Sequence, residues 1–268
     1  MITDTLNMFQ LTGQVAIVTG GSGVYGSHMC LGLCEAGATV IVGGHDGTAC
    51  EETAAVLRDK GFQAIGLGVD LRDEASIIEF IRQVRVQYGR IDILVNAAVS
   101  RYENRNLEHI TRDGWDATAQ VNGRGTILIT REVVKQMREQ EKGTIINVSS
   151  IMGVVAPRFP MYELDDIISG VEYTYNKYGM MGLTQWMAAY YGRYNIRVNC
   201  LSPGGNNLKG TKDEIRSQAV ADEYLRQTPM GRFTDERDLK GPVVFLASEA
   251  SRYMTGQNLI IDGGYTIW

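Results

Sequence analysis

Short, nearly continuous apolar runs alternate along the chain with longer segments in which apolar residues recur every three or four positions. A run of about four to eight apolar residues predicts a buried β-strand, whereas the three-to-four spacing predicts an amphipathic helix. Helical patterns fill most of the intervals between the runs. The predicted strands are Val15–Thr19, Thr39–Val42, Ala64–Val69, Ile91–Asn96, Thr144–Ser149, Ile196–Ser202 and Asn258–Ile261.

This regular alternation predicts an α/β fold, in which a doubly wound parallel sheet of seven strands is covered by helices on both faces. Because no repeat, low-complexity tract or linker interrupts the pattern, we expect residues 1–268 to form one domain. In such sheets ligands bind beyond the carboxyl ends of the strands. The functional residues are therefore expected just after each strand.

Composition and charge narrow the classes of function. Hydrophobic residues make up 44% and charged residues 21% of the chain, as in a globular protein with a substantial core. The net charge of −5 argues against a nucleic-acid or anionic-membrane partner, for which a basic face is favourable. No apolar run approaches the ~20 residues that span a bilayer, and Met1–Gln10 lacks the basic residues of a signal peptide. We therefore expect a cytoplasmic protein.

No metal site is expected. The chain has three histidines and four cysteines, which form neither a Cys-x-x-Cys pair nor a cluster with metal-ligand spacing. Cys30 and Cys34 would share a helix face, but two buried free thiols are the commoner arrangement.

The turn after the first predicted strand is rich in glycine. Thr19–Gly26 follows this strand and opens a helix, where glycines let backbone N–H groups approach a pyrophosphate. The alternative is that these glycines only make the turn. The spacing is not a clean Gly-x-Gly-x-x-Gly.

The residues after the second and third strands bear on cofactor choice. Gly44 and His45 offer neither the acid that binds a ribose 2′-hydroxyl nor the arginine that suits a 2′-phosphate. Asp46 has two interpretations, a ribose contact or the N-cap of the next helix. Asp70 would bind an adenine amino group or cap the following helix.

A serine, a tyrosine and a lysine are the candidates for proton transfer. Ser150 follows the fifth predicted strand, and Tyr173 and Lys177 lie four positions apart, so both face the same side of a helix. The pair alone is weak evidence, because this spacing is also frequent on ordinary helix surfaces. Asn122 lies beside Gly123 in a helical pattern that both residues disfavour, which predicts a local kink.

Taken in this order, the motifs resemble the short-chain dehydrogenase/reductase family, whose members have a single Rossmann-type domain. The likeness covers nearly the whole chain. Among subgroups, the chain resembles bacterial oxidoreductases of sugars, sugar acids and polyols. The later segments that carry the likeness are Ile196-Arg197-Val198-Asn199, Ser202-Pro203-Gly204, Phe245-Leu246-Ala247-Ser248, Thr255-Gly256-Gln257 and Asp262-Gly263-Gly264.

The resemblance implies an NAD(P)-dependent oxidoreductase that interconverts a secondary alcohol and a ketone by hydride transfer. Tyr173 would exchange a proton with the substrate oxygen, Ser150 would orient that oxygen, and Lys177 would lower the pKa of the phenol. Lys177 would also bind the nicotinamide ribose, and Asn122 would hold a water linking this lysine to solvent. The residues implied to contact the cofactor are Gly20, Ser22, Gly23, Val24, Tyr25, His45, Asp46, Asp70, Leu71, Asn96, Ala97, Ala98, Tyr173, Lys177, Pro203 and Gly204.

Two departures from the family pattern concern the cofactor. Val24 replaces the middle glycine of the family turn, so its side chain would crowd the pyrophosphate unless the loop shifts to use Gly23. The family's Asn-Asn-Ala-Gly is replaced by Asn96-Ala97-Ala98-Val99.

A third departure is the distance between serine and tyrosine. Tyr173 follows Ser150 by 23 positions (173 − 150), nearly twice the family's usual spacing, which makes about 154–171 an inserted segment. Tyr162 lies nearer the usual distance, but Asp166 rather than a lysine follows it by four positions. Tyr173 is therefore the assigned residue.

The substrate is expected to be a small polar molecule. The acids of the insert together with Arg158 suggest a polar lid, the alternative being a solvated loop or an oligomer contact. Residues 204–227 are expected to form the substrate loop, in which Asn206 and Asn207 suit hydroxyls or a carboxylate.

The fourth departure is the absence of a clear cofactor selector. Gly23 stands where a base often favours NADP, and Gly44 where an acid favours NAD. We expect a slight preference for NAD, since no base suits a 2′-phosphate and Asp46 would repel it. NADP stays open because Gly44 leaves room and His45 offers a contact.

Two other functions and an assembly are also considered. One alternative is an epimerase or dehydratase that uses a transient hydride, and the other is a non-catalytic nucleotide-binding relative. The family likeness implies a homodimer or homotetramer. The apolar helix Met180–Tyr191 and the segment Tyr265–Trp268 fit such an assembly.

Overall fold

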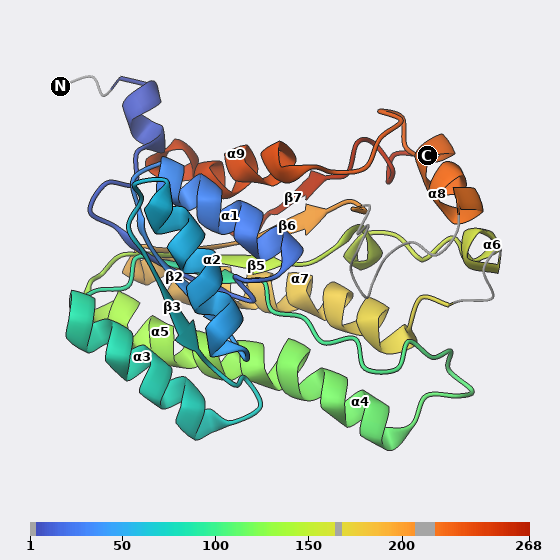
Figure 1. The fold of residues 1–268 in the computed structure, drawn as a ribbon, viewed down its shortest axis with the longest axis horizontal. Helices are drawn as coiled ribbons and strands as arrows, with labels where there is room; N and C mark the ends of the chain where they lie inside the picture. Colours follow the sequence, from blue (N-terminus) through green and yellow to red (C-terminus); the bar gives the residue numbers. More distant parts are fainter. Residues whose placement is uncertain (1–3, 164–167, 207–217) are drawn as a thin grey trace.

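The computed structural model describes residues 4–163, 168–206 and 218–268. Its centre is a parallel seven-stranded sheet, which confirms the predicted fold class (Figure 1). The strands are β1 (Val15–Thr19), β2 (Thr39–Gly44), β3 (Ala64–Gly68), β4 (Ile93–Asn96), β5 (Gly143–Val148), β6 (Ile196–Pro203) and β7 (Asn258–Ile261). Their order is β3-β2-β1-β4-β5-β6-β7, so the winding direction changes between β1 and β4, where such sheets bind their ligands.

Helices cover both faces of the sheet (Figure 1). One face carries α1 (Val24–Glu35), α2 (Gly47–Asp59) and α9 (Glu236–Ala247). The opposite face carries α3 (Glu74–Tyr88), α5 (Thr126–Glu139) and α7 (Val171–Tyr191). The remaining helices are α4 (Arg112–Ala119), α6 (Phe159–Tyr162) and α8 (Gln218–Arg226).

The alternation of side chains along β1 explains why both layers form. Ala16 and Val18 point to the layer of α1, α2 and α9, whereas Val15 and Ile17 point to the layer of α3, α5 and α7. All of these residues are buried, as expected for a central parallel strand. Burial of these apolar faces is the main force that holds the three layers together.

Strand boundaries differ from the predicted ones by at most two residues. β4 begins at Ile93 rather than Ile91, and the Asp92 side chain forms hydrogen bonds just before the strand begins. Its carboxylate accepts hydrogen bonds from the backbone N–H of Val15 at 2.9 Å and from Arg90 at 2.7 and 2.8 Å. These bonds fix the entrance of β4 against that of β1.

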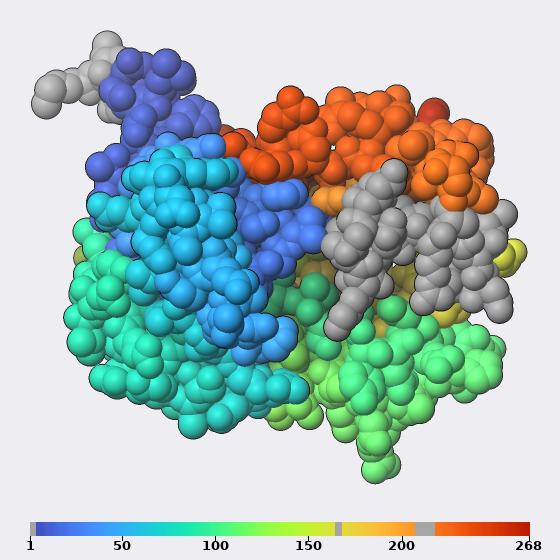
Figure 2. Space-filling view, in the orientation of Figure 1, coloured from blue at the N-terminus to red at the C-terminus, as the bar shows by residue number. Residues whose placement is uncertain are grey.

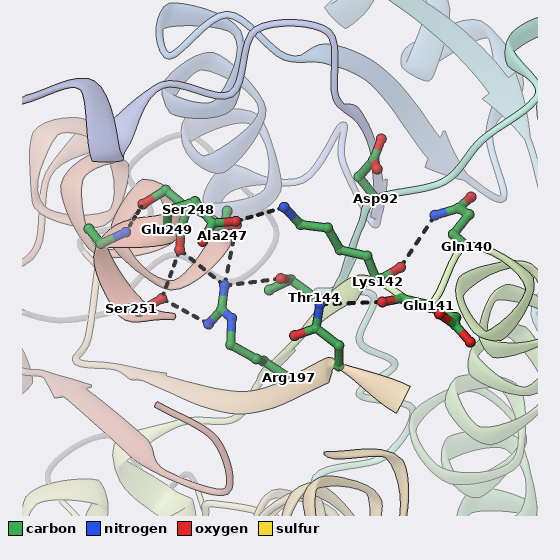
Figure 3. A network of polar contacts seen from close by, with 12 residues as sticks. Asp92, Gln140, Glu141, Lys142, Thr144, Arg197, Ala247, Ser248, Glu249 and Ser251 are labelled. Atoms are coloured by element: carbon green, nitrogen blue, oxygen red, sulfur yellow. Dashed lines mark hydrogen bonds and ion pairs between the residues drawn. The ribbon is translucent and has the colours of Figure 1, made fainter. Parts of the chain in front are cut away.

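A half-buried arginine joins the amino ends of β5 and β6 to the end of α9 (Figure 3). These amino ends lie opposite to the carboxyl ends of the strands, beyond which ligands bind in such sheets. Arg197 donates to Ser251 Oγ at 2.8 Å and to Thr144 Oγ1 at 3.0 Å. It also donates to the carbonyls of Leu246 and Ser248, at 2.9 and 3.1 Å. Burial lowers the pKa of this guanidinium, while five oxygen acceptors offset the cost of its charge.

Two further findings concern membrane-spanning helices and metal-binding side chains. No helix among the described residues combines the length and the apolar character needed to cross a bilayer. The four cysteines are buried free thiols, and no group of metal-binding side chains occurs within 4–163, 168–206 and 218–268.

Candidate active site

A cavity of about 1530 Å³ lies beyond the carboxyl ends of the strands. The segments that follow β1 to β6 all contribute to its lining. The surface is recessed between the blue N-terminal part and the green and orange parts of the chain (Figure 2). Because single-ligand pockets are commonly about 300–1,000 Å³, this cavity has room for a dinucleotide and a small substrate together.

The turn after β1 is shaped by close backbone packing. Gly20 has a φ of +65°, and a Cβ there would lie 2.7 Å from the Cα of Ala98. A Cβ on Gly26 would lie 2.0 Å from the carbonyl oxygen of Gly20. Both positions therefore require glycine, which lets the turn pack against the segment that follows β4 and lets α1 pack against the turn.

The N-terminus of α1 has the character of an anion site. Its N-cap, Gly23, provides no side-chain hydrogen bond, and the first turn contains no acid. By contrast, Asp46 and Asp73 cap α2 and α3. Since α1 lines the cavity, its first N–H groups and its dipole are directed at the space where a pyrophosphate would fit.

Three other residues of this segment, Ser22, Val24 and Tyr25, line the cavity. Val24 begins α1 with its side chain about one-third exposed (36%). Its helical backbone does not require a glycine at this position. The Tyr25 hydroxyl donates to the carbonyl oxygen of Gly204 after β6.

The structure corrects the prediction that Asp46, after β2, contacts the cofactor. Gly44 and His45 line the cavity, but Asp46 is not part of the lining. Its carboxylate accepts from the backbone N–H of Ala49 at 3.0 Å, so the helix-cap interpretation is confirmed and a cofactor contact of this side chain is not. A Cβ on Gly44 would lie 2.9 Å from Cys50 Sγ, which leaves little room for an acidic selector.

Asp70 and Leu71 line the cavity after β3. The carboxylate of Asp70 accepts from Arg72 at 2.8 to 3.2 Å, and these hydrogen bonds lower its pKa. Arg72, which lines the cavity as well, is therefore held in an ion pair with Asp70.

The structure also corrects the prediction that Asn96, at the end of β4, contacts the cofactor. Ala97 and Ala98 line the cavity, but the Asn96 side chain is buried in the protein interior. Its Nδ2 donates to Thr130 Oγ1 at 3.0 Å and to Asn147 Oδ1 at 2.9 Å. Asn96 thus ties β4 to α5 and β5 and does not bind the cofactor through its side chain.

The predicted kink at Asn122 is confirmed, since Gln120–Gly125 form a π-helical turn between α4 and α5. The Asn122 amide donates to the carbonyl of Ser100 at 2.9 Å and accepts from the N–H of Ser100 at 2.7 Å. The turn therefore fixes the loop after β4, and π-helical turns are frequent at functional sites.

Ser150, Tyr173 and Lys177 are brought together at the wall of the cavity. Ser150 is 8% exposed and is hydrogen-bonded to the Tyr173 phenol. Lys177 is 5% exposed, its Nζ lies 5.6 Å from the centre of the Tyr173 ring, and it donates to the carbonyl of Val148 at 2.9 Å. The 23-position spacing thus does not separate the three side chains.

Arg101 is the residue that the sequence analysis missed. Its Nη2 lies 3.2 Å from the Tyr173 hydroxyl, and its Cζ lies 4.6 Å from the centre of the ring. Burial alone would raise the pKa of Tyr173, but Lys177 and Arg101, with the hydrogen bond from Ser150, lower it to about 8. An arginine five positions after the end of β4 carries no motif, so only the folded loop reveals it.

The expected substrate residues are placed differently from one another. Asn206 lines the cavity, whereas Asn207 lies outside the described residues. Arg158 is a correction, because it is not in the lining. It donates to the carbonyls of Tyr265 and Trp268 at 3.1 and 2.6 Å, so it does not form a substrate lid. Pro203 and Gly204 line the cavity as expected.

Comparisons with known proteins identify the relatives of this chain. A family profile described as enoyl-(acyl carrier protein) reductase matches residues 23–266. The 2-dehydro-3-deoxy-D-gluconate 5-dehydrogenase of Escherichia coli (strain K12) is 32% identical over 265 residues, covering 97% of this chain and 98% of that protein.

Solved structures show the same fold. A gluconate 5-dehydrogenase from Burkholderia cenocepacia J2315, in complex with NADP and tartrate, has a TM-score of 0.90 at 30% identity, covering 99% of this chain and 100% of its own. An NAD⁺-bound xylitol dehydrogenase has a TM-score of 0.84 at 29% identity, with 94% and 99% covered. The chain therefore belongs to the short-chain dehydrogenase/reductase family and is an oxidoreductase that uses a nicotinamide dinucleotide.

Proposed function

We propose that the chain interconverts a secondary alcohol and a ketone on a sugar acid or a related polyol. The observation that carries this proposal is the Tyr173 phenol, which lies at the cavity wall with Lys177 and Arg101 beside it. A phenol with a pKa of about 8 exchanges protons near neutral pH, and two cationic side chains suit an anionic substrate.

In the proposed mechanism Tyr173 removes the proton of the substrate hydroxyl during oxidation and returns it during reduction. Ser150 donates a hydrogen bond to the same substrate oxygen and fixes its orientation. Lys177 stabilises the phenolate by its charge. The Asn122 amide is occupied by Ser100, so the water that would link Lys177 to solvent would have to bind the main chain of the π-helical turn.

A bound nicotinamide dinucleotide would supply the other half of the chemistry, which is hydride transfer. The N-terminus of α1 would hold the pyrophosphate, and Ala97 and Ala98 leave space for close passage of the cofactor. Asp70 and Leu71 would contact the adenine.

We propose weak discrimination between the two nicotinamide cofactors, with a slight preference for NAD. Cys50 restricts the space beside Gly44, so no acid selects NAD there. Arg72 is held by Asp70, so its charge is partly neutralised for a 2′-phosphate. Asp46 is turned to its helix and repels neither cofactor at close range.

A sugar acid is favoured over a neutral polyol because Arg101 approaches the Tyr173 hydroxyl to 3.2 Å. A guanidinium binds carboxylates through paired hydrogen bonds. The relatives named for gluconate derivatives support this substrate class. We further propose a homo-oligomer, which the exposed aromatic side chains of Tyr175, Trp186 and Tyr190 on α7 support.

The test is turnover of gluconate, 2-dehydro-3-deoxy-gluconate and xylitol with NAD or NADP, followed by the absorbance of the reduced nicotinamide. Wild-type protein should oxidise a sugar acid, and Tyr173→Phe should lower turnover by about 10³-fold while cofactor affinity persists. Tyr178→Phe, a half-exposed tyrosine on the same helix, is the control and should remain active.

Retained turnover in Tyr173→Phe would reject the assigned acid–base residue. Product formation without net change in reduced nicotinamide would instead indicate an epimerase or dehydratase. Cofactor binding without conversion of any sugar acid or polyol would favour a non-catalytic relative.

A further inference from the structure

The insert between Ser150 and Tyr173 brings a second tyrosine to the cavity. Tyr162 is the last residue of α6 and lines the same cavity as Tyr173. It follows Ser150 by 12 positions (162 − 150). Both tyrosines pack against one cluster of buried residues, which is Ile151, Met152, Met161, Val220, Tyr224 and Tyr265.

Helix α6 is anchored from outside the cavity. Arg158, just before the helix, donates to Gln227 Oε1 at 3.0 Å and to two carbonyls near the C-terminus, those of Tyr265 and Trp268. Its guanidinium also lies 4.6 Å from the centre of the Tyr265 ring. Met161 is 4% exposed in the cluster. These contacts fix the helix that carries Tyr162, as a binding residue requires.

A stack of nearly parallel aromatic rings lies in the same cluster of buried residues. The ring of Tyr224 stacks on Phe233 at 4.9 Å and on Tyr265 at 5.0 Å, with interplanar angles of 7° and 16°. The Tyr224 hydroxyl accepts from the N–H of Gly205, beside the cavity. The insert is thus joined to the segment after β6 through well-packed rings.

The two cavity tyrosines differ in their ionisation. Burial raises the pKa of Tyr162 to about 12, although its hydrogen bond to Ser169 acts in the opposite direction. The pKa of Tyr173 is lowered to about 8. Over the pH range in which Tyr173 titrates, Tyr162 therefore keeps its proton and remains a donor. Environments that push the pKa values of two groups in one site apart give these groups different roles.

We propose that Tyr162 is a specificity-determining residue that binds a second hydroxyl of the substrate, next to the carbon that reacts at Tyr173. Ser169 lines the cavity as well. The insert thereby gives this chain a preference for substrates with vicinal hydroxyls. This inference rests on the proposed function, because it assumes the same substrate pocket.

The test compares Tyr162→Phe with Tyr265→Phe. Tyr265 belongs to the same cluster but does not line the cavity, and its buried hydroxyl has no hydrogen-bond partner among the described residues. Binding of gluconate to the protein–NADH complex is measured by calorimetry, since an alcohol and NADH do not react. Turnover of gluconate and of its monodeoxy derivatives with NAD is measured in parallel.

Tyr162→Phe should weaken gluconate binding by about tenfold and raise its KM similarly, the effect of one lost hydrogen bond. The turnover number and the pH profile should stay unchanged, as should the affinity for NADH. The difference from wild type should vanish for one monodeoxy derivative, the one that lacks the bound hydroxyl. Tyr265→Phe should behave as wild type.

Equal gluconate affinity in Tyr162→Phe and wild type would overturn the inference. If wild-type protein still turns over gluconate, the proposed function stands in that case. An equal loss on all monodeoxy derivatives would also overturn it, because it would indicate a structural role. If wild-type protein converts no sugar acid or polyol, both the proposed function and this inference are overturned.

Discussion

The ionisation of Tyr173 is decided by single residues around it. Its phenol is surrounded by Ser150, Lys177 and Arg101, which together outweigh the effect of burial on its pKa. Burial lowers the pKa of Lys177, whereas the nearby Tyr173 raises it. The pair is therefore mutually supporting, since each partner favours the charged form of the other.

The first prediction at this scale concerns pH. The phenolate is the reactive form in alcohol oxidation, so kcat/KM for oxidation should rise with pH and level off above about 8. Arg101→Met removes a charge that lowers the pKa, and should move this midpoint upward by about one unit. It should also raise KM for gluconate more than for xylitol.

Arg72→Met is the matched control for this prediction. Arg72 lines the same cavity but is paired with Asp70, away from Tyr173. Its replacement should leave the midpoint unchanged. A midpoint in Arg101→Met that equals that of wild type would contradict the role given to Arg101.

At the scale of elements, α6 depends on contacts that lie outside the cavity. Arg158 connects the start of this helix to Gln227 after α8 and to the final residues of the chain. Such a connection acts at a distance, because it fixes where Tyr162 lies without touching the cavity. The contribution of Arg158 should therefore be visible only through Tyr162.

The corresponding prediction is non-additivity. Arg158→Ala should raise KM for gluconate by several-fold, since α6 loses its anchor. In the double variant with Tyr162→Phe, KM should be close to that of Tyr162→Phe alone. Additive effects in this double-mutant cycle would show that Arg158 acts on the substrate independently of Tyr162.

At the scale of the whole molecule, the carboxyl ends and the amino ends of the strands differ in their roles. The cavity occupies the carboxyl edge, whereas Arg197 joins β5, β6 and the end of α9 at the opposite edge (Figure 3). Its acceptors include the carbonyls of Leu246 and Ser248. Stability and function are thus assigned to different ends of the same strands.

This separation gives a prediction about stability. Arg197→Met keeps most of the side-chain volume but removes five hydrogen bonds, those to Ser251, Thr144 and three main-chain carbonyls, so the free energy of unfolding should fall by about 2–4 kcal/mol. Urea unfolding measures this change. Cofactor affinity and the pH midpoint of oxidation should remain those of wild type, and a shift in either would show that the two edges are coupled.

Much of this architecture was accessible from the pattern of apolar residues. The strand positions and the parallel sheet followed from local periodicity, since a strand buried on both faces needs a continuous apolar run. The glycine turn followed from its glycines between a predicted strand and a predicted helix. The kink at Asn122 and the grouping of Ser150 with Tyr173 and Lys177 were also predictable. In each case the signal lies within a few neighbouring residues or in a family motif.

Other features depended on where side chains point after folding. Asp46 and Asn96 follow strands as cofactor-binding residues do, but the first caps its own helix and the second points into the protein interior. Arg158 was expected near the substrate and instead binds the C-terminal segment. The partners of Asn96 and Arg158 are distant in sequence, so the sequence does not reveal them. For Asp46 the sequence leaves both a local cap and a cofactor contact open, and only the folded structure shows which one forms.

By itself, then, the sequence determined the order of the elements and the residues available at the carboxyl edge, because these depend on local patterns. Only the tertiary structure decided that Arg101 lies against Tyr173 and that Tyr162 lines the same cavity. Both contacts join segments that are far apart along the chain. Their positions are set by the packing of whole loops and helices, and no local pattern records such packing.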